Sequence, residues 1–377
     1  MVQTNYWFPP AEFHARLGRV QAALKARGLD AMLAFQPESV TWITGFFTRA
    51  YSSFQFAIIP AEGSPTMFCR DVEEYYLDST CVFPDRVMWT DSDDRLAVAV
   101  GAITSRIGTA AAIGMEKSSW MLDAQRWEAI TSALTGARIE DVSGLVSDLT
   151  KIKSPAEIVY HRNAARAAEA GMRAGIDTAA TGVTEREMAA EICAAMIRAG
   201  SDLPGPGVLS SGERAFHLHG GYSDRVLARG DIVQLEVTPN VRHYHSRFMR
   251  PFRVAEASDE DFAIAEKLIA IQDAAIAEVR PGVAATVPDA IYREAVLGAG
   301  LREVYTNKTF YTVGLNLAPG GDGLEAHPAA NWSFEAGMVL HTYVIAKGFG
   351  MSETILVTLD GSERLTRFER KLFVTAR

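Results

Sequence analysis

Three polar residues stand in contexts that suit acid–base or ion-pair chemistry: His219, Glu236 and Arg247. Glu236 interrupts the apolar run 232–237, and a carboxylate in a buried strand needs a partner or a raised pKa. Arg247 is expected on the next strand, where it either pairs with Glu236 or binds a substrate carboxylate through two parallel hydrogen bonds. His219 lies in a glycine-rich turn. It is either a surface-loop histidine or, because histidine titrates near neutral pH, a base and acid in turn.

The elements that must position these residues fall into two halves. In the first half, amphipathic helices are predicted over 11–28, 96–107 and 122–134, and short strands over 31–35, 54–59, 66–69, 87–90 and 111–115. Strands that alternate with helices predict an α/β domain over residues 1–150.

The second half begins with helix-start signals. Ser154, Pro155 and Glu157 give an N-cap, a proline in the first turn and an early carboxylate, so a helix is predicted over 155–179. A capping box at Thr184 starts a second helix. The β-rich stretches 231–254 and 338–358 flank helices at 259–279 and 287–297. The fold class is therefore α/β (α+β), with one domain over 1–150 and another over 151–377; a chain of 377 residues is long enough for both.

Composition limits the classes of function. A net charge of −9 argues against nucleic acid and anionic membranes as partners and leaves small molecules. No apolar run approaches the ~20 residues that span a bilayer, and the first residues do not resemble a signal peptide. The three cysteines form no CxxC pair, so neither disulfides nor a structural zinc is expected. We expect a cytoplasmic protein.

Four segments of the second half, in order, resemble the pita-bread fold shared by methionine aminopeptidase, prolidase and creatinase. They span residues 152–157 (IKSPAE), 219–231, 244–252 and 334–358. The first is similar to a K-S-x-x-E helix entry, and the second to a histidine followed a dozen residues later by G-D. The third is similar to G-Y-x-S-D-x-T-R-T-F, and the fourth to L-E-P-G-M-V followed by E-D-T-V-L-V-T. The resemblance implies a creatinase-type N-terminal α/β domain before a pita-bread catalytic domain.

The metal-binding positions of this family depart from its pattern. In the metallopeptidases, two aspartates, a histidine and two glutamates hold two metal ions. The resemblance places other residues at four of these positions and a longer carboxylate at the first: Glu236, Arg247, Tyr311, Tyr343 and Ser352. A fixed positive charge where a dication would lie is strongly unfavourable. We therefore predict no bound metal, and no other cofactor is expected.

Creatinase and ectoine hydrolase are the members of the superfamily that this chain most resembles in character. The resemblance implies hydrolysis of a C–N bond, in an amidine or amide, in a small cationic or zwitterionic amino-acid-like compound. His219 aligns with the catalytic histidine of creatinase, with His217 as the alternative if the alignment shifts. Glu236 is then a general base, a nucleophile or a binder of the substrate's positive group. Met249 replaces a carboxylate of creatinase, which disfavours creatine itself.

Further residues are assigned to substrate binding. Arg247 is expected to bind a substrate carboxylate, and Glu353, at the start of a strand, to bind an ammonium group. Tyr343 and Tyr311 either hydrogen-bond the substrate or fill space with their rings. His327 aligns roughly with a substrate-binding arginine of creatinase. The loop containing Arg49 and Tyr51 corresponds to one that reaches into the partner's active site in creatinase, which implies a homodimer.

Two other functions stay open. A metal-dependent Xaa-Pro aminopeptidase or dipeptidase would need the metal positions to be assigned wrongly. The histidines at 243, 245, 327 and 341 invite a metal site, but apart from His243 and His245 on one strand face their spacing matches no standard ligand set. A non-catalytic binding protein would resemble chaperone-like relatives, but this chain has neither their charged tails nor an evident large partner surface.

Overall fold

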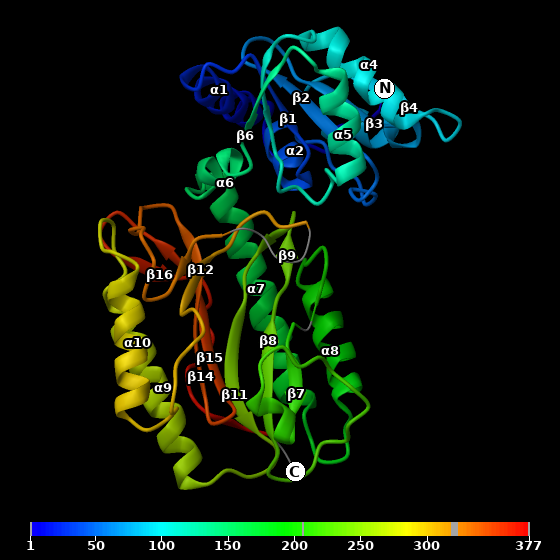
Figure 1. The fold of residues 1–377 in the computed structure, drawn as a ribbon. Coiled ribbons are helices and arrows are strands. Elements are labelled where there is room, and N and C mark those ends of the chain that lie inside the picture. Colours follow the sequence, from blue (N-terminus) through cyan, green and yellow to red (C-terminus); the bar gives the residue numbers. More distant parts are fainter. Residues whose placement is uncertain (1, 206, 318–322, 376–377) are drawn as a thin grey trace. The chain divides into compact units, whose positions relative to one another are not determined.

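The computed structural model describes residues 2–205, 207–317 and 323–375. The chain divides into two compact units: the first comprises the described residues up to Thr150 together with Leu317, and the second comprises the others from Lys151 on (Figure 1). In the part of the chain that the structure describes, no helix has both the length and the apolar character needed to span a bilayer.

The first unit is a six-stranded sheet flanked by helices, in the strand order β4-β3-β2-β1-β5-β6 (Figure 1). Helix α2 escaped prediction because nearly all of its residues are buried, so the sequence carries no amphipathic period there. The elements are α1 (Pro10–Ala26), β1 (Ala31–Ala34), α2 (Pro37–Thr44), β2 (Phe56–Pro60), β3 (Thr66–Arg70), η1 (Asp71–Glu73), α3 (Glu74–Thr80), β4 (Arg86–Trp89), α4 (Arg95–Ile107), β5 (Ala112–Met115), α5 (Ala124–Ala133), β6 (Arg138–Asp141) and α6 (Leu145–Thr150).

Two helices of the second unit cover a four-stranded sheet of order β17-β11-β8-β7. The capping boxes at Ser154–Glu157 and Thr184–Glu187 are both formed, at the starts of α7 (Pro155–Thr178) and α8 (Glu185–Arg198). Gly175 lets α7 approach the sheet closely, because a Cβ there would lie 2.6 Å from Leu235 Cδ2. The strands are β7 (Leu209–Ser211), β8 (Ile232–Val237), β11 (Phe248–Arg253) and β17 (Phe373–Val374), with η2 (Gly212–Phe216) after β7 and the hairpin β9 (Asn240–Val241) and β10 (Tyr244–His245) between β8 and β11.

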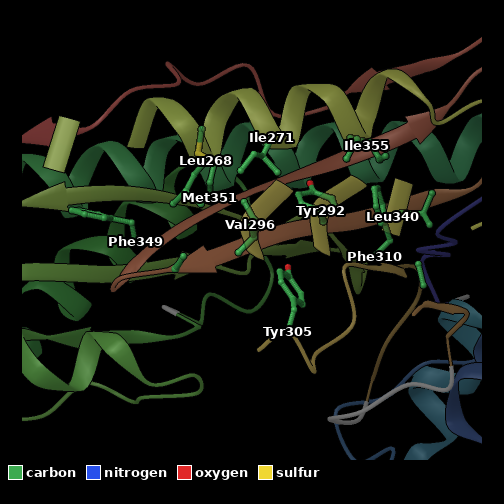
Figure 2. Close-up of a cluster of buried hydrophobic side chains, with 14 of the residues drawn as sticks. Leu268, Ile271, Tyr292, Val296, Tyr305, Phe310, Leu340, Phe349, Met351 and Ile355 are labelled. Atoms are coloured by element: carbon green, nitrogen blue, oxygen red, sulfur yellow. The ribbon is translucent and has the colours of Figure 1, made fainter. Parts of the chain in front are cut away.

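A second, five-stranded sheet of order β13-β12-β14-β15-β16 packs against two further helices. Figure 2 shows the core between them, where Leu340, Met351 and Ile355 of the strands meet side chains of the helices. The elements are α9 (Asp259–Ala277), α10 (Thr286–Gly298), β12 (Phe310–Thr312), β13 (Glu325–Ala326), β14 (Val339–Ala346), β15 (Phe349–Val357) and β16 (Ser362–Arg364).

Alternation along the strands turns one set of side chains away from both helical layers. Leu340 and Val344 of β14 lie in the core beside α9 and α10, so residues 341 and 343 point to the opposite face. On β8, Leu235 and Val237 pack beside α7 and α8, so residues 234 and 236 point away from those helices. The two sheets therefore present polar positions on the faces that their helices leave uncovered.

Candidate functional site

Glu236 on β8 and Arg247, directly before β11, form an ion pair in the second unit. The antiparallel register of β8 and β11 pairs Glu236 with Met249. Arg247, two residues earlier, therefore lies diagonally across from Glu236 on the same face. Its Nε donates a hydrogen bond to Glu236 Oε1 at 2.8 Å. Of the two alternatives given for Arg247, the structure shows the pairing with Glu236.

The ion pair is buried on the carboxylate side and open on the guanidinium side. Glu236 is 4% exposed in its side chain, whereas Arg247 is 30% exposed. Burial disfavours the charge on Arg247 more than any other single cause, but Glu236, Tyr311 and Tyr343 together outweigh burial and raise the pKa of Arg247. The two terminal nitrogens of Arg247 have no hydrogen-bond partner among the described residues. They are available to an anionic group.

The strands β12, β14 and β15 present a polar and aromatic face. Tyr311 lies directly opposite His341, and His341 lies opposite Thr354. Tyr343 lies opposite Ser352. Because Tyr343 and Ser352 are two residues away from His341 and Thr354, all five side chains belong to one face of the sheet.

Two contacts join this face to the ion pair. The guanidinium carbon of Arg247 lies 5.4 Å from the centroid of the Tyr311 ring, within cation–π range. The backbone N–H of Arg247 donates to Thr354 Oγ1 at 2.8 Å, and that hydroxyl lies 2.8 Å from the Arg247 carbonyl. Arg247, Tyr311 and Tyr343, which the sequence assigned to one site, therefore lie close together in the second unit.

His341 completes the cluster, and sequence reasoning gave it no role. Its Nε2 lies 3.5 Å from Glu236 Oε1, and its side chain is 1% exposed. Burial, followed by the charges of Arg247 and Lys308, holds the pKa of His341 well below its ordinary value. The available signal was alternation, because His341 lies two residues before Tyr343 on one strand and must share its face.

The two tyrosines serve as neutral phenols in this arrangement. Burial raises the pKa of both Tyr311 and Tyr343, so neither ionises near neutral pH. Their ring centroids lie 6.2 Å apart, and the His341 ring stacks on Tyr343 at 5.4 Å with an interplanar angle of 11°. The rings pack against His341, as space-filling side chains would.

Glu353 does not lie where the sequence suggested. It is inside β15 rather than before a strand, and its side chain is fully buried. Its carboxylate pairs with Arg250 Nη2 at 2.8 Å and with Arg370 Nε at 3.2 Å, and it also accepts from the Thr366 hydroxyl. These partners occupy the carboxylate, and alternation turns it away from the face of Ser352 and Thr354.

His219 lies in an anchored loop between η2 and β8. Its side chain is exposed, and its backbone has φ 66°, a left-handed conformation that costs energy for a residue other than glycine. The buried carboxylate of Glu185 holds this loop by accepting from Ser211 Oγ at 2.7 Å and from Ser223 N and Arg214 Nη1, both at 2.8 Å. Among the described residues, His219 forms no hydrogen bond or ion pair with Glu236.

The remaining predicted site residues lie outside the strands that form the cluster. His327 follows β13, and its Nδ1 accepts from Ala329 N at 3.2 Å. His243 lies with positive φ in the turn of the β9–β10 hairpin, rather than on a strand face with His245. Arg49 and Tyr51 belong to the first unit, in the turn between α2 and β2; Arg49 is exposed and Tyr51 half-buried.

Two family models together match most of the chain. Residues 16–150 match the creatinase/prolidase N-terminal domain, and residues 160–376, more than half of the chain, match metallopeptidase family M24. The chain belongs to metallopeptidase family M24. The resemblance predicted from the four segments is therefore confirmed.

Relatives and solved structures agree with this assignment. The chain is 24% identical to the ectoine hydrolase of Halomonas elongata, over 99% of this chain and 100% of that protein. It is 30% identical to an Xaa-Pro dipeptidase of Pyrococcus horikoshii, over 61% of this chain and 67% of that protein. The dipeptidase PepE of Mycobacterium ulcerans superposes with a TM-score of 0.83 at 23% identity, covering 98% of this chain and 100% of that one. The predicted fold, with a creatinase-type N-terminal domain and a pita-bread catalytic domain, is confirmed.

The family name implies bound metal, and the residues of the cluster do not fit it. Glu236 is the only carboxylate among the five residues assigned to metal-binding positions, and the guanidinium of Arg247 lies 2.8 Å from it. Tyr311, Tyr343 and Ser352 offer neutral hydroxyls, which are poor substitutes for the carboxylates and imidazole that bind hard dications. Among the described residues, no group of three or more His, Cys, Asp or Glu side chains could hold a metal ion.

Proposed function

We propose that this chain is a metal-independent hydrolase that cleaves a C–N bond, in an amidine or amide, of a small zwitterionic, amino-acid-like compound. The observation that carries the proposal is the ion pair of Glu236 and Arg247, at the positions assigned to two metal-binding aspartates of the family. The guanidinium supplies a permanent positive charge beside the buried carboxylate. A dication placed there would face that charge at close range.

The cluster offers complementary groups for both ends of a zwitterion. The free terminal nitrogens of Arg247 suit a substrate carboxylate, which guanidinium groups bind through two parallel hydrogen bonds. Glu236 suits the positive group of the zwitterion, as the carboxylate of the cluster. Glu353 is not part of this assignment, because Arg250 and Arg370 already neutralise it.

The reaction matches what these groups can do without a Lewis acid. The carbon of an amidinium is already electrophilic, so attack needs a base for water and an acid for the leaving nitrogen. Water adds to the carbon, the C–N bond breaks, and the products are an amide and an ammonium group. The ectoine hydrolase of Halomonas elongata supports this class of substrate, because ectoine is a cyclic amidine that carries a carboxylate. Two histidines are candidates to move the proton: His219, from the resemblance to creatinase, and His341, from its place beside Glu236.

A second candidate function is metal-dependent cleavage of Xaa-Pro dipeptides. The 30% identity to the Pyrococcus horikoshii Xaa-Pro dipeptidase favours it. It requires a binuclear centre, for which the cluster has one carboxylate and one guanidinium. The composition of the cluster therefore favours the first proposal.

A hydrolysis screen with metal control separates the two. The protein is assayed on ectoine, hydroxyectoine, creatine, Gly-Pro and Met-Pro, each with a chelator and with added Mn²⁺ or Co²⁺, and its metal content is measured by elemental analysis. We expect turnover of an amidine or amide that the chelator does not affect, and no stoichiometric metal. Xaa-Pro cleavage that appears only with Mn²⁺, or two tightly bound ions per chain, would overturn the proposal. Absence of any turnover together with a tight protein partner would favour a binding protein instead.

We also propose that the protein acts in the cytoplasm as a homodimer. The three cysteine thiols are free, which suits a reducing compartment. The dimer rests on the resemblance of the loop that contains Arg49 and Tyr51 to that of creatinase. Sedimentation analysis of the full chain tests it, and a monomer at micromolar concentration would refute it.

A further inference from the structure

His341 is a buried polar group that the surrounding protein does not satisfy. It is 1% exposed, and neither ring nitrogen has a hydrogen-bond partner among the described residues. Leaving a buried donor or acceptor unpaired costs stability, so such groups call for a functional explanation. The nearest carboxylate oxygen is Glu236 Oε1, at 3.5 Å from Nε2.

Two aromatic rings fix the orientation of the imidazole. Tyr343 stacks on it with an interplanar angle of 11°, and Tyr311 meets it edge-on, with ring centroids 5.0 Å apart. The ring cannot rotate far without displacing one of these side chains. Nε2 lies on the side of Glu236, at 3.5 Å from Oε1, and the buried Nδ1 has no hydrogen-bond partner among the described residues. A carboxylate beside one imidazole nitrogen leaves the other nitrogen for proton transfer.

The charged and titratable groups around His341 come from four elements. Glu236 lies on β8, Arg247 precedes β11, Lys308 precedes β12, and the phenols of Tyr311 and Tyr343 lie on β12 and β14. Burial lowers the pKa of His341 the most, and the positive charges of Arg247 and Lys308 lower it further. The ring is therefore neutral near neutral pH and has a lone pair that can accept a proton.

We propose that His341, held beside Glu236, takes the proton from the water that attacks the substrate carbon and passes it to the leaving nitrogen. This role rests on the hydrolase function proposed above. As the C–O bond forms, one proton of the water moves to the imidazole. As the C–N bond breaks, its electron pair stays on nitrogen and receives that proton. One water is consumed, nothing is oxidised or reduced, and the imidazole returns to its neutral form.

Arg247 couples this step to the arrival of substrate. In the free protein its positive charge offsets Glu236 and disfavours protonation of His341. A substrate carboxylate on the free terminal nitrogens of Arg247 neutralises that charge, and the negative charge of Glu236 then favours the imidazolium. The base becomes stronger when an anionic substrate group is bound. The inference therefore specifies the substrate class, a compound whose carboxylate lies beside the C–N bond that is cleaved.

Nuclear magnetic resonance of histidine-labelled full-length protein tests the coupling without any substrate. The signal of His341 is assigned with His341→Gln, and its protonation midpoint is compared between wild type, Arg247→Met and the charge-preserving control Arg247→Lys. We expect the midpoint to rise by about one to two pH units in Arg247→Met and to stay near the wild-type value in Arg247→Lys. The double variant Arg247→Met/Glu236→Gln should lose that rise. An unchanged midpoint in a folded Arg247→Met protein overturns the coupling.

Kinetics test the catalytic role on whichever substrate the screen identifies. His341→Gln should lower kcat by about 100-fold or more with little change in KM. In the wild type, the acid limb of kcat should lie at higher pH than the acid limb of kcat/KM, because bound substrate strengthens the base. His341→Gln with near wild-type kcat, or coincident acid limbs, overturns the role of His341. If His219→Ala abolishes turnover and His341→Gln does not, His219 moves the proton and the hydrolase proposal stands. If the wild type hydrolyses nothing, the hydrolase proposal itself fails, while the resonance experiment still reports on the coupling.

Discussion

The buried carboxylate of Glu353 offers a sharp test of which acidic residues serve structure and which serve substrate. Both Glu353 and its partner Arg250 are 0% exposed in their side chains, and their atoms lie 2.8 Å apart. Arg370 Nε lies 3.2 Å from the same carboxylate oxygen. The change Glu353→Gln keeps the shape of the side chain and removes its charge. We expect it to destabilise the second unit and to leave substrate binding intact.

The size of this loss in stability depends on the hydrogen-bond partners that Arg250 keeps when the charge of Glu353 is removed. Removing one member of a buried ion pair costs about 3–5 kcal/mol, because the other charge is left uncompensated. The guanidinium of Arg250 retains backbone carbonyls of Ser352 at 2.9 Å, Phe368 at 3.1 Å and Glu369 at 2.7 Å. These partners solvate part of its charge, so we place the loss in the free energy of unfolding at the lower end, about 3 kcal/mol.

Equilibrium urea unfolding followed by far-ultraviolet circular dichroism measures this loss. Tryptophan fluorescence would mainly report the first unit, since only Trp332 of the six tryptophans lies beyond residue 150. The matched control is Glu363→Gln, whose carboxylate pairs with Arg162 at 2.7 Å on the surface and should cost about 1 kcal/mol or less. A Glu353→Gln protein with the wild-type urea midpoint and a raised KM would show that Glu353 binds substrate, and the assignment given above would be wrong.

Two further predictions concern carboxylates outside the cluster. Burial raises the pKa of Glu116 from 4.5 to about 7, so its contribution to stability is fully present below pH 4.5 and is lost as pH rises through about 7. Between these two pH limits, the contribution of Glu116 to the free energy of unfolding changes by about 3 kcal/mol. Glu116→Gln should remove this pH dependence, measured as fluorescence-detected unfolding at pH 5 and pH 8. An unchanged difference between the two pH values would contradict the prediction. Glu185→Gln should weaken the anchor of the His219 loop, because its carboxylate accepts from Ser211, Ser223 and Arg214. Limited proteolysis within residues 212–228 should become faster, and an unchanged cleavage rate would mean that the loop is held by other contacts.

Local sequence signals predicted most helices and strands because each followed one physical rule. The capping boxes at Ser154 and Thr184 mark the starts of α7 and α8, and Gly28, with φ 63°, follows the end of α1. The strand β12 was not predicted, because three residues carry too little alternation to identify a strand. Its pairing with β14 depends on residues about 30 positions away.

Part of the cluster could be predicted, at positions where both the residue type and the expected strand pairing pointed to the site. Glu236 stood out as a charge in an apolar strand, and Arg247 as its neighbour across a hairpin. His341 was missed because a histidine in a buried strand gives no sign of its partner until β8 and β14 are placed together. Glu353 was misjudged because its partners Thr366 and Arg370 lie in a later segment that carries no motif.

On the proposed function, an arginine where relatives hold metal ions narrows the chemistry that this cluster can perform. A guanidinium neutralises a nearby carboxylate permanently, whereas it cannot lower the pKa of a bound water to about 7 as a catalytic metal does. A cluster built on Glu236 and Arg247 must therefore draw its base from the protein and its electrophile from the substrate. His341 beside Glu236 meets the first need on the proposed function. An amidinium carbon meets the second, because its positive charge already polarises the bond that water attacks, whereas an uncharged peptide bond would receive no comparable activation from these residues.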